Sequence, residues 1–403
     1  MEVIPFCAVR PANDKVHLVA TRSYVSYTPS QLKSKLNENP FSFLHIIHPD
    51  DSGDSLHSSK NLTERFKKVR SRYLQFLDEG ILKRDPLPCF YVYRQTQEGK
   101  SFTGIMGAVS LTDYNQGKIK KHELTLAKRE STFTQYLEAT GINAEPVLLV
   151  NQNSVRLGEI MGGITASRPE YHFTTTDKKS HEVWIVSDRD IIQNIRNEFV
   201  SSGAFYIADG HHRCSSSANL AELKRREKVQ DGKWNHCLAF ILDENQVKIH
   251  EFNRIIKDLG DHTPESFLHI LKESFIVEAM DQPLATARKS EWKMYLDHGW
   301  YSVRYMHSSV LPDAELLSQK ILSKILGIHD LRKDKRIEFC EGPKGLEFIR
   351  KKVDQNKGGV GFALPPVTVQ DLKSTADKGL TMPPKSTWIE PKLRSGLIVY
   401  ELE

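Results

Sequence analysis

One stretch of the sequence decides the fold: Phe205-Tyr206-Ile207-Ala208-Asp209-Gly210-His211-His212-Arg213-Cys214-Ser215-Ser216-Ser217. Residues 205–208 are apolar and predict a buried strand, Asp209-Gly210 predicts a turn, and the hydroxyl residues that follow predict a helix. Backbone amides at a helix start have no partner inside the helix and lie at the positive end of its dipole. The sequence therefore predicts an anion-binding turn, to which Arg213 adds a planar fork suited to phosphate or carboxylate.

The same turn also has a purely structural interpretation, in which Asp209 caps the helix, Gly210 allows the backbone to turn and both histidines are solvated. An aspartate, a glycine, two histidines and an arginine within five residues favour the functional interpretation. We therefore expect Asp209, Gly210, His211, His212 and Arg213 to bind a nucleotide or another phosphorylated ligand, and His212 also to move a proton. A metal site on the aspartate and the histidines is a weaker prediction, because neighbouring side chains diverge, and we predict no protein-held metal.

A second cluster of charged residues lies in Lys120-Lys121-His122-Glu123. Its structural interpretation is a solvated helix face, which is the usual meaning of a charge run. In the functional interpretation, Lys121 binds phosphate, His122 supplies positive charge, and Glu123 acts as a general base or a magnesium ligand. We take His122 and Glu123 as candidate catalytic residues, and composition alone does not decide between the two interpretations.

Composition sets the limits for these hypotheses. The 403 residues exceed the usual size of one core, so we expect two or three lobes. A formal net charge of +5 is close to neutral for this length, and the five cysteines are scattered without pairing motifs. The first fifteen residues have no signal-peptide pattern, and no run of eighteen apolar residues occurs. We therefore expect a cytoplasmic protein without membrane association.

Strand and helix patterns alternate along the chain, which predicts a mixed α/β (α+β) fold. We divide it into an N-terminal α+β region (1–115), a nucleotide-binding core (116–259) and a C-terminal α+β region (260–403). Strands are expected at 16–20, 43–47, 89–94, 104–110, 147–150, 182–186, 205–208, 238–242, 293–296, 300–304 and 360–364. Helices are expected from residue 30 and at 61–79, 118–136, 190–201, 213–228, 264–274, 313–326 and 367–376.

The tail Met382–Gly396 is too rich in proline for a helix, yet it carries Trp388 and three cations. A mobile terminus is one interpretation, but such segments rarely contain tryptophan. We favour an ordered loop near an anionic site.

The turn, the second charged cluster and the tail are all similar to segments of a known family. The chain resembles a large bacterial and archaeal family of unknown function, often labelled ParB-like or partition-protein-like. The matching stretches run from end to end: Ile4–Phe6 with Arg10-Pro11, Asn39-Pro40 with Ser42–His45, Ile119–Glu123, Tyr206–Arg213, Asn253-Arg254 with Lys257–Leu259, Leu326–Ile328 with Asp334–Ile337, and Met382–Gly396.

The resemblance implies a ParB/sulfiredoxin-like core. Related proteins of that fold hold nucleotide phosphates on a Gly-x-x-Arg turn, which Gly210–Arg213 matches, and they include a free-serine kinase, partition proteins and sulfiredoxin. Sulfiredoxin needs a cysteine where this chain has His211, so sulfinic acid repair is not expected. Partition proteins add a helix-turn-helix that we do not find, although Lys224-Arg225-Arg226 could contact phosphates nonspecifically, so we expect no sequence-specific DNA binding.

The resemblance therefore implies a nucleotide-dependent phosphotransferase acting on a small hydroxylated metabolite, in the specific case free L-serine to O-phosphoserine, with ATP or ADP and Mg²⁺. Two departures bear on catalysis: Ser23-Tyr24-Val25 stands where the family commonly has Pro-Tyr-Asp, and Leu126 where it usually has an arginine. The alternative is a non-catalytic, nucleotide-sensing or DNA-associated regulator. The sequence leaves open the donor, the acceptor, the identity of the base, whether catalysis survives these departures, and whether the chain forms a homodimer.

Overall fold

A computed structural model describes residues 1–48, 62–229, 232–283, 288–356 and 358–403. These residues form two compact units. The first unit comprises residues 1–121, 125–247 and 391–403, and the second comprises 122–124 and 248–390. The predicted division at residues 115 and 259 stays a prediction.

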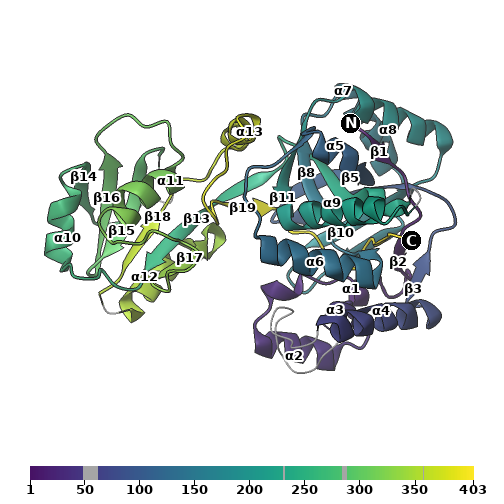
Figure 1. Ribbon diagram of the computed structural model, residues 1–403, viewed down its shortest axis with the longest axis horizontal. Helices are drawn as coiled ribbons and strands as arrows, with labels where there is room; N and C mark the ends of the chain where they lie inside the picture. The colour runs from purple at the N-terminus through teal and green to yellow at the C-terminus, as the bar shows by residue number, and fades with distance from the viewer. Residues whose placement is uncertain (49–61, 230–231, 284–287, 357) are drawn as a thin grey trace. The chain divides into compact units, whose positions relative to one another are not determined.

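The first unit is built on a nine-stranded mixed sheet (Figure 1). Its strands are, in spatial order, β6 (Ile119–Lys120), β11 (Phe205–Asp209), β8 (Val147–Asn151), β12 (His236–Asp243), β5 (Lys100–Ser110), β4 (Phe90–Gln97), β10 (Ser180–Val186) and β9 (Tyr171–Thr174), with β1 (Val3–Ile4) paired to β5. The pairs β11–β6 and β12–β8 are parallel, and the other pairs are antiparallel. All five residues of β8 are buried, which explains why this strand is a continuous apolar run followed by one asparagine.

Helices cover this sheet (Figure 1). Helix α9 (His211–Arg226) packs on β8 and β12, α6 (Ala127–Thr140) packs on α9, and α4 (Leu62–Asp78) packs on α6. Helices α7 (Val155–Thr165) and α8 (Arg189–Ser201) pack on each other. The shorter elements are β2 (Val9–Pro11), η1 (Tyr24–Ser26), α2 (Pro29–Glu38), β3 (Leu82–Arg84), α5 (Leu111–Asn115), β7 (Ile142–Asn143), η2 (Lys233–Asn235) and β20 (Tyr400–Glu401).

Several sequence predictions for the first unit are confirmed. In α4, the buried residues Phe66, Val69, Tyr73 and Phe76 recur at helical spacing, and the chain leaves the helix through Gly80 at φ 67°. The predicted hairpin is β4 and β5, joined through Gly99 at φ 76°. Both elements could be predicted because their apolar period and their turn residue lie within one short segment.

Three predictions were wrong. Residues 16–20 and 43–47 are the short helices α1 (Val16–Val19) and α3 (Leu44–Ile47), not strands. Residues 118–136 become helical only from Ala127, because Ile119–Lys120 form strand β6 instead. Segments of four or five apolar residues fit one helical turn as well as a strand, and here packing decides, since Val19, Leu44 and Ile46 are fully buried in one cluster.

The second unit contains a seven-stranded antiparallel sheet. Its strands are, in spatial order, β14 (Phe275–Met280), β16 (Gly299–Tyr305), β15 (Glu291–Leu296), β18 (Val360–Ala363), β13 (Lys248–Ile256) and β17 (Ile337–Glu341), with β19 (Thr387–Glu390) paired to β13. Its helices are α10 (Pro264–Leu271), α11 (Asp313–Leu317) continued by the π-helix η3 (Ser318–Ser323), η4 (Gly342–Lys344), α12 (Gly345–Gln355) and α13 (Val369–Asp377).

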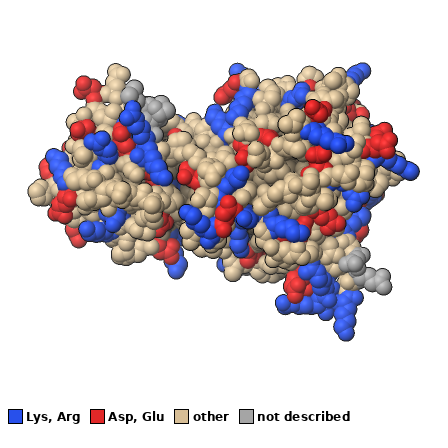
Figure 2. All heavy atoms as spheres, turned by 90° about the horizontal axis from the view of Figure 1, so that it is seen from above, with Lys and Arg blue, Asp and Glu red and all other residues tan. Residues whose placement is uncertain are grey.

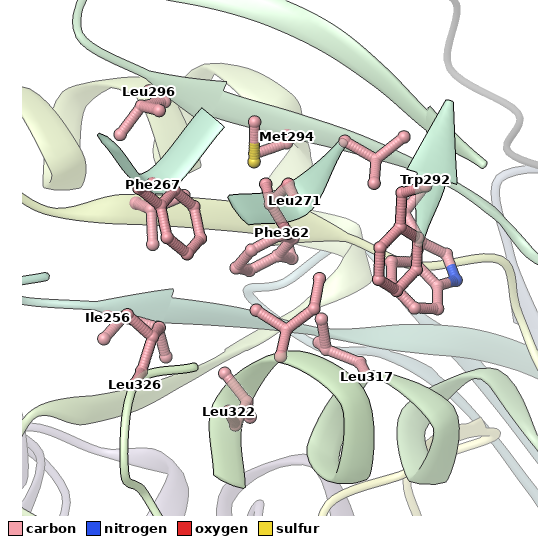
Figure 3. Close-up of a cluster of buried hydrophobic side chains, with 14 of the residues drawn as sticks. Ile256, Phe267, Leu271, Trp292, Met294, Leu296, Leu317, Leu322, Leu326 and Phe362 are labelled. Atoms are coloured by element: carbon pink, nitrogen blue, oxygen red, sulfur yellow. The ribbon is translucent and has the colours of Figure 1, made fainter. Parts of the chain in front are cut away.

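Two hydrophobic clusters lie in this unit. The larger one joins Phe267 of α10, Leu317 of α11 and Phe362 of β18 (Figure 3). The smaller one contains Ile255 of β13 and Ile349 of α12. Burying one such side chain contributes roughly 1.5–3 kcal/mol, so each cluster holds its helices on the sheet. The expected mixed α/β fold with an α+β C-terminal part is confirmed.

Candidate anion-binding site

The predicted turn lies at the end of β11 and the start of α9. The pairing of β11 with β8 shifts register between Ile207 and Asp209, which changes the direction of the strand at its last residue. Gly210 follows at φ 99° and ψ 28°, a conformation that residues with a Cβ rarely adopt. A Cβ at Gly210 would also lie 3.0 Å from Nε of Arg213, so a side chain here would displace the guanidinium as well as strain the backbone.

The backbone amides at this helix start face outward from the helical ladder. Gly210 has no side chain to cap α9, and the first helical hydrogen bond runs from the amide of Cys214 to the carbonyl of Gly210, at 3.0 Å. The amides of residues 211–213 precede this bond and have no acceptor within the helix. With sixteen residues, α9 has a full dipole, and its positive end lies at these amides.

The Arg213 side chain folds back over the turn. Its Nη1 donates to the carbonyl of Pro146 and lies 3.9 Å from Oε2 of Glu145, and its Nη2 lies 3.7 Å from Oδ2 of Asp209. These ion pairs are long, and the side chain keeps 23% of its surface exposed. The guanidinium is therefore positioned by the protein and still accessible to a ligand.

The C-terminal segment brings a second cation to the same turn. Nζ of Lys392 lies 3.1 Å from Oδ2 of Asp209. Burial raises the pKa of Asp209, but the positive charges of Lys392 and Arg213 outweigh it and hold that pKa well below its usual value. Asp209 is therefore ionised at neutral pH.

Two neighbours of Lys392 fasten this segment to the first unit. Nη2 of Arg394 donates to Asp177 at 2.6 Å and to Thr175 at 2.9 Å, and the hydroxyl of Ser395 donates to Glu145 at 2.6 Å. These bonds agree with our expectation, from the composition of residues 382–396, of an ordered loop near an anionic site.

A further carboxylate lies on the first turns of α6. Oε1 of Glu130 accepts hydrogen bonds from the hydroxyls of Ser215 and Thr125. Burial raises the pKa of Glu130, but these hydrogen bonds and the charges of His212 and Lys121 lower it overall. The structure thus brings two predicted binding residues, His212 and Lys121, into the electrostatic range of one carboxylate beside α9.

His122 and Glu123, the last two residues of the second charged cluster, belong to the second unit. The amide of Met382 donates to the carbonyl of His122 at 2.8 Å, and Glu123 forms an isolated β-bridge with Met382. His122 is buried, at 1% exposure. The catalytic roles of His122 and Glu123 stay predictions.

Two carboxylates lie close to Arg213 at this turn. Carboxylate oxygens are suitable Mg²⁺ ligands, and Asp209 and Glu145 both lie within 4 Å of Arg213. In the part of the chain that the structure describes, however, no three metal-ligating side chains gather into one site.

Three residues of this site were not predicted as site residues: Glu130, Glu145 and Lys392. Glu145 lies two residues before strand β8, which runs antiparallel to β11, so the start of one strand lies beside the end of the other. Lys392 was part of the tail that the sequence analysis placed near an anionic site. For Glu130, the only signal in the sequence is its position in a charged segment that was expected to be helical.

The family of the chain follows from a family model that matches residues 3–325, with the description "Protein of unknown function (DUF1015)". The chain belongs to the DUF1015 family. No match was found for this DUF1015 protein among the curated proteins.

Three solved structures match this chain at low identity and with TM-scores below 0.5. SbnI with a C-terminal truncation from Staphylococcus aureus is 12% identical, with a TM-score of 0.39, and the match covers 72% of this chain and 85% of that one. A free serine kinase in complex with AMP is 16% identical over 73% of this chain and 90% of that one, with a TM-score of 0.37. A conserved hypothetical protein from Pyrococcus furiosus is 17% identical over 73% and 94%, with a TM-score of 0.36.

On the face drawn in Figure 2, basic and acidic side chains are interspersed. Among the described residues, no helix combines the length and the apolar character needed to cross a bilayer.

Proposed function

We propose that this DUF1015 protein is a nucleotide-dependent phosphotransferase that acts on a small hydroxylated metabolite, in the specific case free L-serine. One observation carries the proposal: the uncapped start of α9, the Arg213 guanidinium and the Lys392 ammonium converge on the single turn Asp209-Gly210. Amides, a planar fork and a point charge are the donors that proteins use for phosphate groups.

The long ion pairs of Arg213 leave its guanidinium able to bind a better-placed anion. Two cations face the carboxylates of Asp209 and Glu145, and the arginine pairs at 3.7 and 3.9 Å are longer than good charge-assisted hydrogen bonds. A phosphate oxygen at hydrogen-bonding distance would therefore gain more from Arg213 than these carboxylates do. Each hydrogen bond to a charged group is worth about 1.5–3 kcal/mol.

In the proposed reaction, the acceptor hydroxyl oxygen attacks the terminal phosphorus of the nucleotide. A bond forms between that oxygen and phosphorus, the bond from phosphorus to the bridging oxygen breaks, and the shortened nucleotide leaves with the electron pair. The hydroxyl proton passes to a base, for which Glu123 is the candidate from the sequence. Arg213 and Lys392 stabilise the charge on the phosphoryl oxygens, and Mg²⁺ would neutralise part of that charge when bound.

The proposal is tested by incubating the protein with L-serine, Mg²⁺ and ATP or ADP and following O-phosphoserine by mass spectrometry. R213A is expected to lose product formation by about 100- to 1,000-fold, the range for removing one group that stabilises transition-state charge. The matched control is R226A on the same helix, because Arg226 is 75% exposed and pairs only with Glu222 in the described part of the chain. R226A should keep the wild-type rate.

Binding assays separate the proposal from its alternative. If the wild-type protein binds ADP and forms no product with serine or other hydroxylated metabolites, a nucleotide sensor replaces the transferase. If R213A and the wild type bind ADP equally, the turn is not the phosphate site, and the proposal fails.

A further inference from the structure

A second arginine, Arg254 on β13, lies in the interior of the second unit. Its side chain has 0% exposure and is among the largest fully buried side chains of the chain. The guanidinium lies over the ring of Phe339 on the neighbouring strand β17, with Cζ 4.6 Å from the ring centre. Arginine is among the residues that are almost never fully buried without a partner, so this position needs an explanation.

The hydrogen bonds of Arg254 leave its donors poorly satisfied. Nη1 donates to the carbonyl of Phe252 at 2.7 Å, and Nη2 reaches the carbonyl of Pro384 only at 3.4 Å. Nε is buried and has no acceptor in the described structure. A guanidinium has five N–H groups arranged for planar, two-oxygen acceptors, and neutral carbonyls satisfy this arrangement only in part.

No acidic side chain neutralises this charge. Among the described residues, no carboxylate forms an ion pair with Arg254. Burial alone lowers its pKa to about 9, so the side chain is still charged at neutral pH. Two other buried arginines differ: Arg10 is paired with Asp85 at 2.7 Å, and Arg394 with Asp177 at 2.6 Å. A buried charge without a counterion costs free energy that an arriving anion would recover.

The segment that carries Pro384 contacts Arg254 through the Pro384 carbonyl. Pro384 is half-buried, and the next residue, Lys385, is exposed. Lys385 has φ 58°, a strained conformation for a residue with a side chain, and its ammonium lies 5.4 Å from the ring centre of Phe252. Residues 384 and 385 therefore bring one weak acceptor to Arg254 and a cation to the ring of Phe252, two residues earlier on β13.

We infer that Arg254 is the binding residue for a small oxyanion, a carboxylate or phosphate group, which takes the place of the Pro384 carbonyl as its acceptor. Phe339 provides the flat apolar surface against which the guanidinium is held. All of these residues belong to the second unit, so the inference does not depend on the proposed phosphotransfer at Gly210.

The test compares urea unfolding of the full chain in sodium acetate, sodium phosphate and sodium chloride at matched ionic strength. It is done in the R213A background, so that anion binding at the first turn does not contribute. A ligand that binds only the folded state raises the unfolding midpoint. Since these salts also stabilise folded proteins in general, we expect acetate, phosphate or both to raise the midpoint, relative to chloride, more in R213A than in R213A/R254M.

The outcomes distinguish the two sources of the oxyanion. A rise in acetate indicates a carboxylate ligand, and a rise in phosphate alone indicates a phosphoryl group. The inference is overturned if neither anion raises the midpoint of R213A, or if R213A/R254M responds as strongly as R213A. Should R213A/R254M fail to fold, R213A/R254K keeps the charge without the planar fork. A response of this variant equal to that of R213A would refute the inference, and a weaker one would support it.

Discussion

Substituting Gly210 by alanine should damage the phosphate-binding turn more than the fold. The substitution adds one methyl group at a residue with φ 99°, where a side chain is strained, and places it 3.0 Å from both Cζ and Nε of Arg213. Arg213 is a flexible side chain, so it will yield before the backbone does. We therefore expect the guanidinium to leave its present position between Asp209 and Glu145.

The magnitude has two separable parts. The backbone strain of a non-glycine residue at positive φ costs about 1–2 kcal/mol, and this part should appear in the free energy of unfolding. The loss of one charge-assisted contact to phosphate costs about 1.5–3 kcal/mol, which corresponds to a roughly 10- to 150-fold weaker binding of ADP.

Urea unfolding and calorimetric titration with ADP measure these two parts. The matched control is G117A, because Gly117 also lies in the first unit at positive φ, 74°, and a Cβ there would meet nothing within 4 Å. Both variants should lose similar stability, and only G210A should lose ADP affinity. If G210A and G117A bind ADP equally well, Arg213 does not hold the phosphate in the way that we reason.

Further predictions concern charged groups of the first unit. K392M should raise the pKa of Asp209, measured by NMR titration of its carboxyl carbon, and an unchanged pKa would contradict the contact. The pair stabilises the fold above the unfolded-state pKa of about 3.9, and this stabilisation is lost as the pH falls below it. K392M should therefore reduce the stability gained above that pH. Burial lowers the pKa of His181 to about 3, so the unfolded chain binds the proton more readily. Stability should then fall by roughly 1.4 kcal/mol per pH unit as the pH drops from about 6.5 towards 3, and H181F, measured by urea unfolding at several pH values, should lose this slope. R10M should destabilise the fold by about 3–5 kcal/mol because it leaves the carboxylate of Asp85 buried without its partner, whereas a loss of about 0–1 kcal/mol would mean that the pair behaves as an exposed one.

The sequence predicted the turn because its information is local. An apolar strand, Asp209-Gly210 and a helix follow one another within a dozen residues, and each element constrains the next. The same holds for α4 with Gly80 and for the β4–β5 hairpin. Phosphate binding by these residues stays a prediction, but the backbone geometry on which it depends is the expected one.

The remaining parts of the site depend on contacts between distant segments. Glu145 reaches Arg213 only because β8 runs antiparallel to β11, and Lys392 reaches Asp209 from 183 residues further along the chain. No local pattern specifies either pairing. Strand β13 was missed for another reason: buried Arg254 and its neighbour Asn253 interrupt the apolar pattern that identifies a strand.

The return of the chain to the first unit has a consequence for its synthesis. Residues 391–403 supply Lys392, the bridge from Val399 to Val9, and strand β20 with its partner β7. At about 5–20 residues per second, a ribosome needs roughly 7–30 s to make residues 248–390, and the first 247 residues must wait for that time without their last strand. Lys392 can therefore pair with Asp209 only after residues 248–390 have been made, so until then the turn of the nascent chain lacks one of its two cations.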